Sequence, residues 1–392
     1  MDSRSQRPSV LPDSSSNEYR HARDLVGASP PFGARPVSLA ARDSLRQRAK
    51  ECGSLHGVLA AVSGGADSLA LAVATAAAAA PLGVPFTACV VDHRMREGSS
   101  VEAQQVVAVL EELGISTRIL TAAPKNDSGR GPSTGLEAAA RDLRHALLET
   151  AAQDWMKSAG LSSVDIVLGH TMDDQAETVL LRLGRGASPD ALSSMRKVVP
   201  TQYQGISKVR PLLGLRRADT ESFCDSLGLI PVQDPTNRAD GPWRTRGGQA
   251  LPRSAVRERV LPALGEALGQ DPVIALARVA DLLAEDRDAL TDAGRKALDS
   301  STLMVTEGAS MSLDVQSLSR YLPAVRKRAL RAALTQIGAP MPGSTHLESL
   351  DQSLFHRTNA QGDPRVVTLP GGLIAKREGE ALVFRTSSAS DE

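Results

Sequence analysis

A glycine-rich turn joins two apolar segments of this chain. Residues 58–79 read VLAAVSGGADSLALAVATAAAA, so an apolar run stops abruptly at Ser-Gly-Gly-Ala-Asp-Ser before an alanine-rich run begins. A turn of this kind between a buried strand and a helix exposes backbone N–H groups at a helix end that favours negative charge. The residue types therefore predict a phosphate site formed by Ser63, Gly64, Gly65, Ala66, Asp67 and Ser68.

This turn differs from two common phosphate-binding loops. Neither the lysine of G-x-x-x-x-G-K-[ST] nor the glycine spacing of G-x-G-x-x-G is present in this stretch. A plain tight turn is the alternative interpretation. It does not explain why two serines and an aspartate accompany the glycines.

A second group of reactive side chains follows another apolar run, in VLGHTMDDQAETVLLRLGRG at residues 167–186. His170, Asp173, Asp174 and Glu177 recur at helical spacings, so most of them share one face. Three carboxylates this close repel each other unless a metal ion or an ammonium group lies among them. The alternative is a helix N-terminus whose dipole favours acidic residues, which explains one or two acids but not the histidine.

Both motifs lie in a region where apolar runs alternate with helical patterns. We expect strands at residues 58–62, 86–92, 117–120 and 165–168, and helices at 68–80, 100–113, 135–160 and 173–183. This alternation predicts an α/β domain with a mainly parallel sheet and helices on both faces.

The composition changes along the chain and predicts three parts. Residues 1–40 are rich in Pro, Ser and Arg, so we expect a disordered tail, followed by the α/β domain at 41–240. Residues 241–392 read as a mainly helical region that ends in short strands with Gly-Gly turns. A secretory signal and a membrane-spanning run are both absent, and the three cysteines show no metal-binding spacing, so we expect a cytoplasmic protein. The formal net charge is zero, so any nucleic-acid surface must be a local patch.

Six motifs occur in the order typical of one enzyme family. Besides the glycine-rich turn and the acidic group, they include VVDHRMREGS (90–99), GLEAAARDLRHALL (135–148), VRPLLGLRR (209–217) and QDPTNR (233–238). On these residues the chain resembles the tRNA(Ile)-lysidine synthetases, which are members of the N-type ATP-pyrophosphatase (PP-loop) group. The resemblance covers residues 55–237 and resumes at RSAVRERVLPAL, 253–264.

The resemblance implies a two-step ligation at the wobble cytidine of the CAU anticodon of tRNA(Ile). ATP adenylates the C2 carbonyl oxygen of the cytosine and releases pyrophosphate. The amine of free lysine then attacks C2, and AMP leaves. ATP and Mg²⁺ are the implied cofactors, and tRNA and L-lysine are the implied partners.

The resemblance also suggests roles for individual residues. Asp67, Asp174 and Glu177 are the expected catalytic residues, with Asp67 also on the magnesium side and the other two binding lysine. The ATP site is expected to use Ser63, Gly64, Gly65, Ala66, Asp67, Ser68, His93, His170 and Asp173. Arg141, Arg253 and Arg257 are the expected tRNA contacts, and residues 241–392 the expected tRNA-binding region. His93 could equally be a core or turn histidine, and Arg141 a solvated residue of a helix.

The chain departs from the family pattern in the tail before residue 40, in about eight extra residues between Asn237 and Arg253, and in Ser254, where the family commonly has Asn. Two other classes of protein fit the sequence less well. Thiolating tRNA enzymes need catalytic cysteines or an iron–sulfur cluster, which the cysteine pattern disfavours. A nucleotide-binding protein without catalysis would be expected to lose Asp67 or the acidic group, and both are present.

Overall fold

The computed structural model describes residues 20–53, 55–92, 98–121, 136–193, 195–232, 240–241, 249–306, 310–340, 343–355 and 366–386. The chain divides into two compact units, Met1–Asp281 and Leu282–Glu392, which are described separately here. This division falls within helix α11 (Pro272–Ser301), later in the chain than the boundary expected near residue 240.

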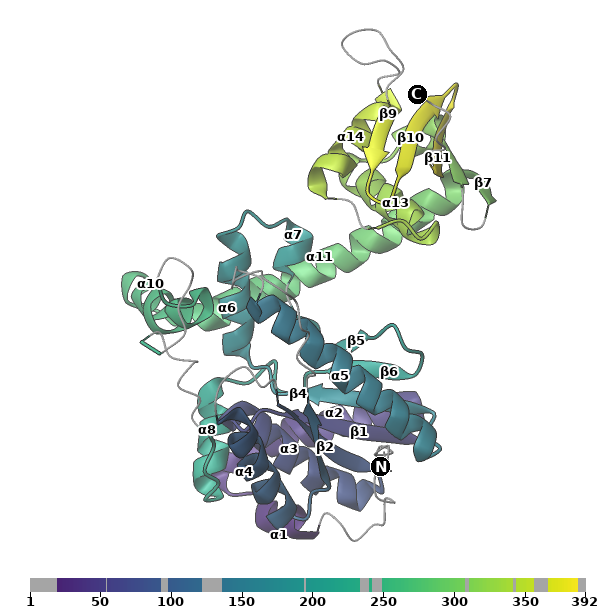
Figure 1. Ribbon diagram of the computed structural model, residues 1–392. Helices are drawn as coiled ribbons and strands as arrows, with labels where there is room; N and C mark the ends of the chain where they lie inside the picture. Colours follow the sequence, from purple (N-terminus) through teal and green to yellow (C-terminus); the bar gives the residue numbers. More distant parts are fainter. Residues whose placement is uncertain are drawn as a thin grey trace, which may run out of the picture. The chain divides into compact units, whose positions relative to one another are not determined.

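The first unit contains a six-stranded sheet in the order β3-β2-β1-β4-β6-β5 (Figure 1). The strands are β1 His56–Val62, β2 Phe86–Asp92, β3 Thr117–Thr121, β4 Ser163–Leu168, β5 Val198–Pro200 and β6 Ile206–Val209. All neighbouring strands are parallel except the β5–β6 pair, so the predicted mainly parallel sheet is confirmed.

Helices cover both faces of this sheet, as expected for a parallel sheet. They are α1 Arg20–Val26, α2 Arg35–Cys52, α3 Ala66–Ala79, α4 Ser99–Glu112, α5 Leu136–Ser158, α6 Met172–Leu183, α7 Pro189–Leu192 and α8 Arg217–Ser226. Apolar residues of α2, α3, α4 and α8 share one core with one face of the strands. Residues of α5, including Leu148 and Trp155, pack with Leu59 and Ile166 on the other face (Figure 1).

The predicted disordered tail at 1–40 is wrong for residues 20–40. Ala22 and Val26 of α1 are buried, as are Ala34 and Val37 around the start of α2. The amide of Ala22 also donates to the Leu113 carbonyl at 3.0 Å. The Pro- and Arg-rich composition concealed small apolar residues that recur at helical spacing and can therefore pack. Residues 1–19 lie outside the described residues.

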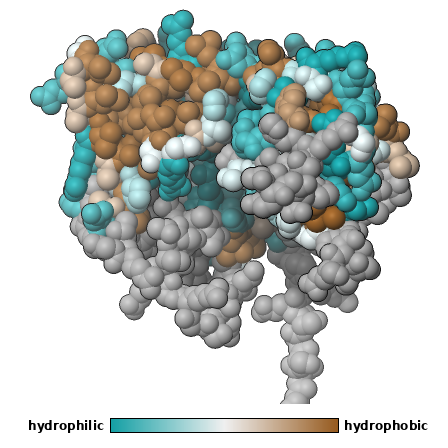
Figure 2. Space-filling view, turned by 90° about the horizontal axis from the view of Figure 1, so that it is seen from above, coloured by the Kyte–Doolittle hydropathy of each residue, from teal (hydrophilic) through white to brown (hydrophobic). Residues whose placement is uncertain are grey.

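A helical extension follows the sheet, within the region 241–392 that was expected to be mainly helical. It comprises α9 Pro252–Ala255, a π-helical turn η4 Val256–Val260, α10 Leu261–Leu268 and the first part of α11. Val256, Leu261 and Val273 pack with Ala176 of α6, which attaches the extension to the helix that carries the acidic residues. Exposed apolar side chains of the extension include Leu268 and Ile274, and Figure 2 shows a hydrophobic area on the side where Figure 1 places α10.

The second unit contains an antiparallel sheet in the order β7-β8-β11-β10-β9. Its strands are β7 Thr302–Thr306, β8 Ser310–Asp314, β9 Val366–Leu369, β10 Leu373–Glu378 and β11 Ala381–Thr386. Helices α12 Val315–Ser319, α13 Pro323–Gln336 and α14 Ser344–Phe355 complete its core. The strands near the C-terminus were expected, but β7 and β8 were not, because they follow a long helical pattern. No described helix of the chain combines the length and the apolar character that crossing a membrane requires.

Arg326 of α13, which belongs to a basic run in the sequence, is a core residue of this unit. The residue is 7% exposed, and its guanidinium pairs with both carboxylate oxygens of Asp351, at 2.7 and 2.9 Å. It also donates to the Tyr321 carbonyl at 2.7 Å and lies 4.6 Å from the centre of the Phe355 ring. All three nitrogens of this guanidinium therefore donate a hydrogen bond inside the fold.

Replacing Arg326 with Met should destabilise the second unit by about 3–5 kcal/mol, because the Asp351 charge would stay buried without its partner. Hydrogen exchange of the β10 and β11 amides measures this opening free energy within the full chain. Arg295→Gln is the matched control, since its pair with Asp292 is exposed and should contribute little to stability. Equal protection in the two variants would contradict a structural role for the buried pair.

Candidate active site at the carboxyl end of the sheet

Glycine occurs at each of the two positions in the turn between β1 and α3 for a different physical reason. Gly64 has φ +88°, and a Cβ atom there would lie 2.5 Å from a methyl carbon of Val106. Gly65 has an ordinary extended backbone, and a Cβ atom there would meet nothing closer than the Ser63 Oγ at 4.0 Å. The turn itself therefore requires Gly64, whereas Gly65 leaves open space above the loop.

Ser68 fixes the shape of the loop. Its Oγ accepts from the Ser63 amide at 3.1 Å and donates to the Gly65 carbonyl at 3.0 Å. The Ser63 hydroxyl lies 3.1 Å from the same oxygen and is itself exposed. Ser68 thus positions the loop from within, while Ser63 and Gly65 lie on its more exposed side.

Gly169, which follows β4, brings the acidic residues beside this loop. A Cβ atom at Gly169 would lie 2.8 Å from the Asp67 carbonyl oxygen and 2.9 Å from the Ser68 amide nitrogen. The end of β4 therefore passes directly over the first turn of α3. Because α6 begins three residues later, its acids start next to Asp67.

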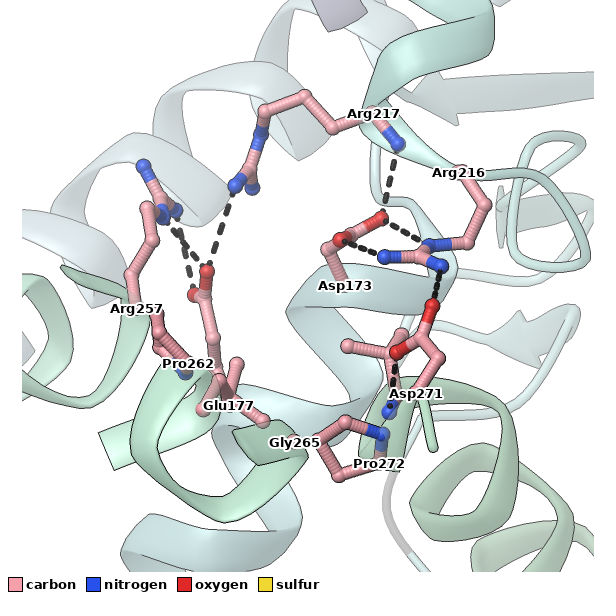
Figure 3. Close-up of a pocket in the computed structure, with 11 residues that line it drawn as sticks. Asp173, Glu177, Arg216, Arg217, Arg257, Pro262, Gly265, Asp271 and Pro272 are labelled. Atoms are coloured by element: carbon pink, nitrogen blue, oxygen red, sulfur yellow. Dashed lines mark hydrogen bonds and ion pairs between the residues drawn. The ribbon is translucent and has the colours of Figure 1, made fainter. Parts of the chain in front are cut away.

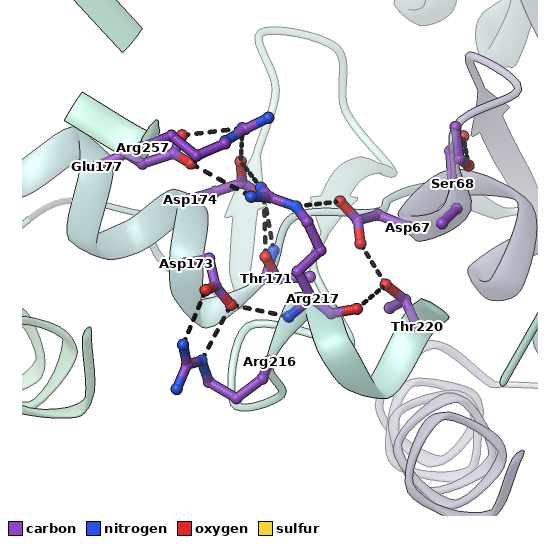
Figure 4. Close-up of polar contacts among 12 residues, drawn as sticks. Asp67, Ser68, Thr171, Asp173, Asp174, Glu177, Arg216, Arg217, Thr220 and Arg257 are labelled. Carbon is purple, nitrogen blue, oxygen red and sulfur yellow. Dashed lines mark hydrogen bonds and ion pairs between the residues drawn. The ribbon is translucent and has the colours of Figure 1, made fainter. Parts of the chain in front are cut away.

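Asp67 is held from two sides by residues of α8 (Figure 4). Its Oδ1 accepts a hydrogen bond from the Thr220 hydroxyl, and its Oδ2 lies 3.4 Å from the Arg217 Nε. Burial raises the pKa of Asp67, and these two donors oppose that shift. The carboxylate is thus oriented by its neighbours rather than free in solvent.

Arg217, at the start of α8, connects the loop to the acidic helix. Besides Asp67, its guanidinium reaches Asp174 Oδ1 at 3.4 Å and Glu177 Oε1 at 3.5 Å (Figure 4). Its backbone amide donates to Asp173 Oδ2 at 2.8 Å. One residue therefore contacts all four carboxylates that the sequence placed in the site.

Glu177 has no exposed side-chain surface, and arginines occupy both of its oxygens. Arg257 Nε lies 2.6 Å from Oε1, and Arg257 Nη2 and Arg253 Nε lie 3.2 and 2.8 Å from Oε2.

Asp174 serves two purposes. Its Oδ2 accepts from the Thr171 amide at 2.9 Å and caps α6, whereas its Oδ1 faces Arg217 and Arg253, each at 3.4 Å.

Asp173 points to the other side of the same helix end. Arg216 donates to both of its oxygens, at 3.0 and 3.1 Å, and also pairs with Asp271 (Figure 3). Burial opposes ionisation, but Arg216 and the Arg217 amide hold the pKa of Asp173 below its ordinary value. Asp173 is therefore a permanent anion that fixes Arg216.

A cavity of about 270 Å³ lies against these charges (Figure 3). One part of its wall is ionic, formed by Asp173, Glu177, Arg216, Arg217, Arg257 and Asp271. The other part is apolar and comes from the helical extension, through Leu261, Pro262, Pro272 and Val273. Such a wall suits a small ligand that carries both charge and an aliphatic chain.

His170 does not join the carboxylates. It precedes α6, and its Nδ1 accepts from the Nε of the buried Arg210 at 3.2 Å. Burial, together with the nearby charges of Arg210 and Arg141, keeps the pKa of His170 well below its ordinary value, so the ring is neutral. Arg141 itself is exposed on α5.

The structure therefore assembles most of the residues predicted from the sequence and adds several others. Arg253 and Arg257, which were expected to contact tRNA, form ion pairs with Glu177. His93 lies outside the described residues. The positive charge expected among the acids is supplied by arginines. The added residues are Arg216, Arg217, Thr220 and Asp271, of which the first two belong to the VRPLLGLRR motif.

Comparison with known proteins identifies the relatives of this chain. Residues 40–264 match a family described as a PP-loop domain, and residues 313–382 match the TilS substrate binding domain. The chain is 40% identical over 330 residues to a tRNA(Ile)-lysidine synthase of Streptomyces coelicolor, covering 84% of this chain and 85% of that protein. It is 38% identical over 344 residues to one of Nocardia farcinica, covering 86% and 94%.

A further relative, a tRNA(Ile)-lysidine synthase of Thermobifida fusca, is 36% identical over 362 residues, or 92% of this chain and 99% of that one. Among solved structures, a U34-tRNA thiolase from Methanococcus maripaludis aligns with a TM-score of 0.48 at 16% identity, over 64% of this chain and 80% of that chain, and carries no functional weight. On the extent of these sequence matches, the chain belongs to the tRNA(Ile)-lysidine synthase family.

Proposed function

We propose that this protein ligates lysine to C2 of the wobble cytidine in the CAU anticodon of tRNA(Ile). ATP adenylates the cytosine O2 with loss of pyrophosphate, and the lysine amine then displaces AMP, which carries that oxygen away. The observation that carries the proposal is the junction of a phosphate-type loop with a carboxylate group through Gly169 and Arg217. A cytoplasmic location, where tRNA and ATP occur together, is part of this proposal.

In this proposal, residues 63–68 hold the ATP phosphates. The open space at Gly65 and the exposed Ser63 support close approach of a phosphate to the loop. His93, His170 and Asp173 complete the nucleotide pocket, with His170 acting as a neutral polar group and Asp173 acting through Arg216.

Asp67 offers the oxygen chemistry that Mg²⁺ prefers, one carboxylate beside a phosphate loop. Mg²⁺ would be held there by Asp67 together with the phosphates and would neutralise charge on the leaving pyrophosphate. Thr220 and Arg217 orient this carboxylate, which keeps it facing the loop.

Asp174 and Glu177 bind the lysine ammonium in this proposal. Two adjacent carboxylates attract a cation, and they can also accept the proton that the amine must lose before it attacks C2. The adjoining cavity, with an ionic and an apolar wall, suits the aliphatic chain of lysine.

The tRNA is proposed to contact Arg141, Arg253 and Arg257 as well as the region from residue 241 onward. Arginine contacts to phosphates give affinity but little sequence information. Selection of the cytosine is therefore assigned to the nucleotide pocket, where an unstacked base can be read by its edge.

The direct test incubates the purified protein with ATP, lysine and a tRNA(Ile) transcript bearing CAU, followed by mass spectrometry of the nucleosides. We expect lysidine, with one AMP and one pyrophosphate per tRNA modified. A methionine tRNA with the same anticodon is the control. Nucleotide binding without pyrophosphate release would instead support the class of non-catalytic binding proteins.

Ala substitutions at the two loop glycines should affect different properties, ATP affinity at Gly65 and thermal stability at Gly64. Gly65→Ala should fold normally but weaken ATP binding, because its new methyl group occupies the open space above the loop. Gly64→Ala should mainly lower the melting temperature, because it strains a positive-φ backbone and meets Val106. Calorimetric ATP titration and thermal melting separate the two effects, and normal ATP affinity in Gly65→Ala would place the phosphates elsewhere.

Asp67→Asn should lower adenylation on the order of 100-fold or more, the scale for losing one group that stabilises developing charge. The amide keeps the size of the side chain and can still accept from Thr220, so we expect the fold to persist. Exchange of labelled pyrophosphate into ATP measures the step. Exchange at the wild-type rate, in protein of unchanged circular dichroism, would remove Asp67 from phosphate chemistry.

Glu177→Gln should raise the lysine concentration needed for turnover with a smaller effect on adenylate formation. Single-turnover kinetics separate the two steps, because adenylate can be measured before lysine is added. The control is Glu111→Gln, which removes the same charge at an exposed position on α4. Loss of adenylation with an unchanged lysine requirement would assign Glu177 to the ATP side.

A further inference from the structure

The carboxylates proposed to receive lysine are already paired with arginines of the chain. Glu177 accepts two donors from Arg257, one from Arg253 and a longer one from Arg217. A carboxylate has about four lone-pair sites, so the acceptor capacity of Glu177 is filled. An ammonium group can therefore reach Glu177 only if at least one guanidinium leaves.

Arg217 is the arginine that stays. Its backbone amide is bonded to Asp173, it begins α8, and its guanidinium also contacts Asp67 and Asp174. Moving its guanidinium would disturb three carboxylates at once, because the same group contacts Asp67, Asp174 and Glu177.

Arg253 and Arg257 are differently placed. They come from α9 and the π-helical turn η4, and their side chains are 26% and 30% exposed, against 20% for Arg217. Both side chains are partly exposed to solvent, so they can exchange partners without crossing the core. Single π-helical turns are rare and occur frequently at functional sites.

The charges of this group are balanced in the structure. Asp67, Asp174 and Glu177 face Arg217, Arg253 and Arg257, three negative charges against three positive ones. Arg216 is paired separately, with Asp173 and Asp271. Lysine alone would add a cation to a neutral group. Lysine together with a phosphate would keep the balance, because guanidinium groups bind phosphate in the same bidentate way as carboxylate.

We propose that Arg253 and Arg257 form a latch on Glu177 that a phosphate group releases, so that lysine binds well only after the phosphate. This arginine latch rests on the proposed function, because it takes Asp174 and Glu177 as the lysine site. The phosphate comes from the tRNA backbone or from the nucleotide. The latch keeps the amine out until an anionic substrate is in place, and by linkage lysine strengthens binding of that substrate.

The first test is calorimetric titration of L-lysine into the free protein and two variants. Arg257→Gln should bind lysine at least about fivefold more tightly than wild type, the lower end of typical coupling between sites. Arg259→Gln removes the same charge at an exposed position in the same turn, and this variant should bind lysine like wild type. Unchanged or weaker binding by Arg257→Gln, with its melting temperature preserved, would overturn the latch, as would an equal gain in Arg259→Gln.

The second test identifies the source of the phosphate. Lysine is titrated into wild-type protein with α,β-methylene-ATP and Mg²⁺ in one arm and with the tRNA(Ile) transcript in the other. At least one arm should tighten lysine binding about fivefold or more, and the gain should shrink in Arg257→Gln. No gain in either arm would overturn the proposal.

A parallel lysidine assay on the wild type keeps the two proposals distinguishable. If wild-type protein forms lysidine while Arg257→Gln shows no tighter lysine binding, the latch alone is wrong. If wild-type protein forms no lysidine, the proposed function itself fails.

Discussion

A buried carboxylate is stable only when cations pair with it, and Glu177 is such a carboxylate. Its charge requires Arg217, Arg253 and Arg257, which come from three different elements. This requirement ties α6 to α8 and to the helical extension. Because Arg217 also reaches Asp67, the same network fixes the carboxylate beside the phosphate loop. The geometry of the site thus follows from the need to neutralise one helix face.

The parallel sheet decides where this neutralisation takes place. β1 and β4 are neighbours, so the loop after β1 and the acidic helix after β4 emerge at the same edge. Gly169 allows the two backbones to approach within contact distance. Phosphate chemistry and amine binding are therefore adjacent because of strand order, and the arginines between them can serve either charge. That shared use gives the site a physical means of ordering its substrates.

Local features of this site could be predicted from the sequence, because their information lies in short spacings. The glycine-rich turn, the acids of α6 and most strands of the first unit are examples. The identity of the neutralising cations could not, since Arg217 and Asp67 are 150 positions apart. The order of residues 20–40 was missed for a related reason: Ala22 and Val26 gain their burial only from distant partners. In Arg326, an apparent surface cation proved to be a core residue through Asp351.

The central claim is that Glu177 exchanges an arginine for the lysine ammonium when a phosphate is present. A crystal structure of the protein with lysine, tRNA and α,β-methylene-ATP tests it most directly. The account predicts an amine nitrogen of lysine within hydrogen-bonding distance of the Glu177 carboxylate, with the Arg257 guanidinium moved from Glu177 to a phosphate oxygen. An intact Arg257–Glu177 pair, with lysine bound elsewhere, would contradict it.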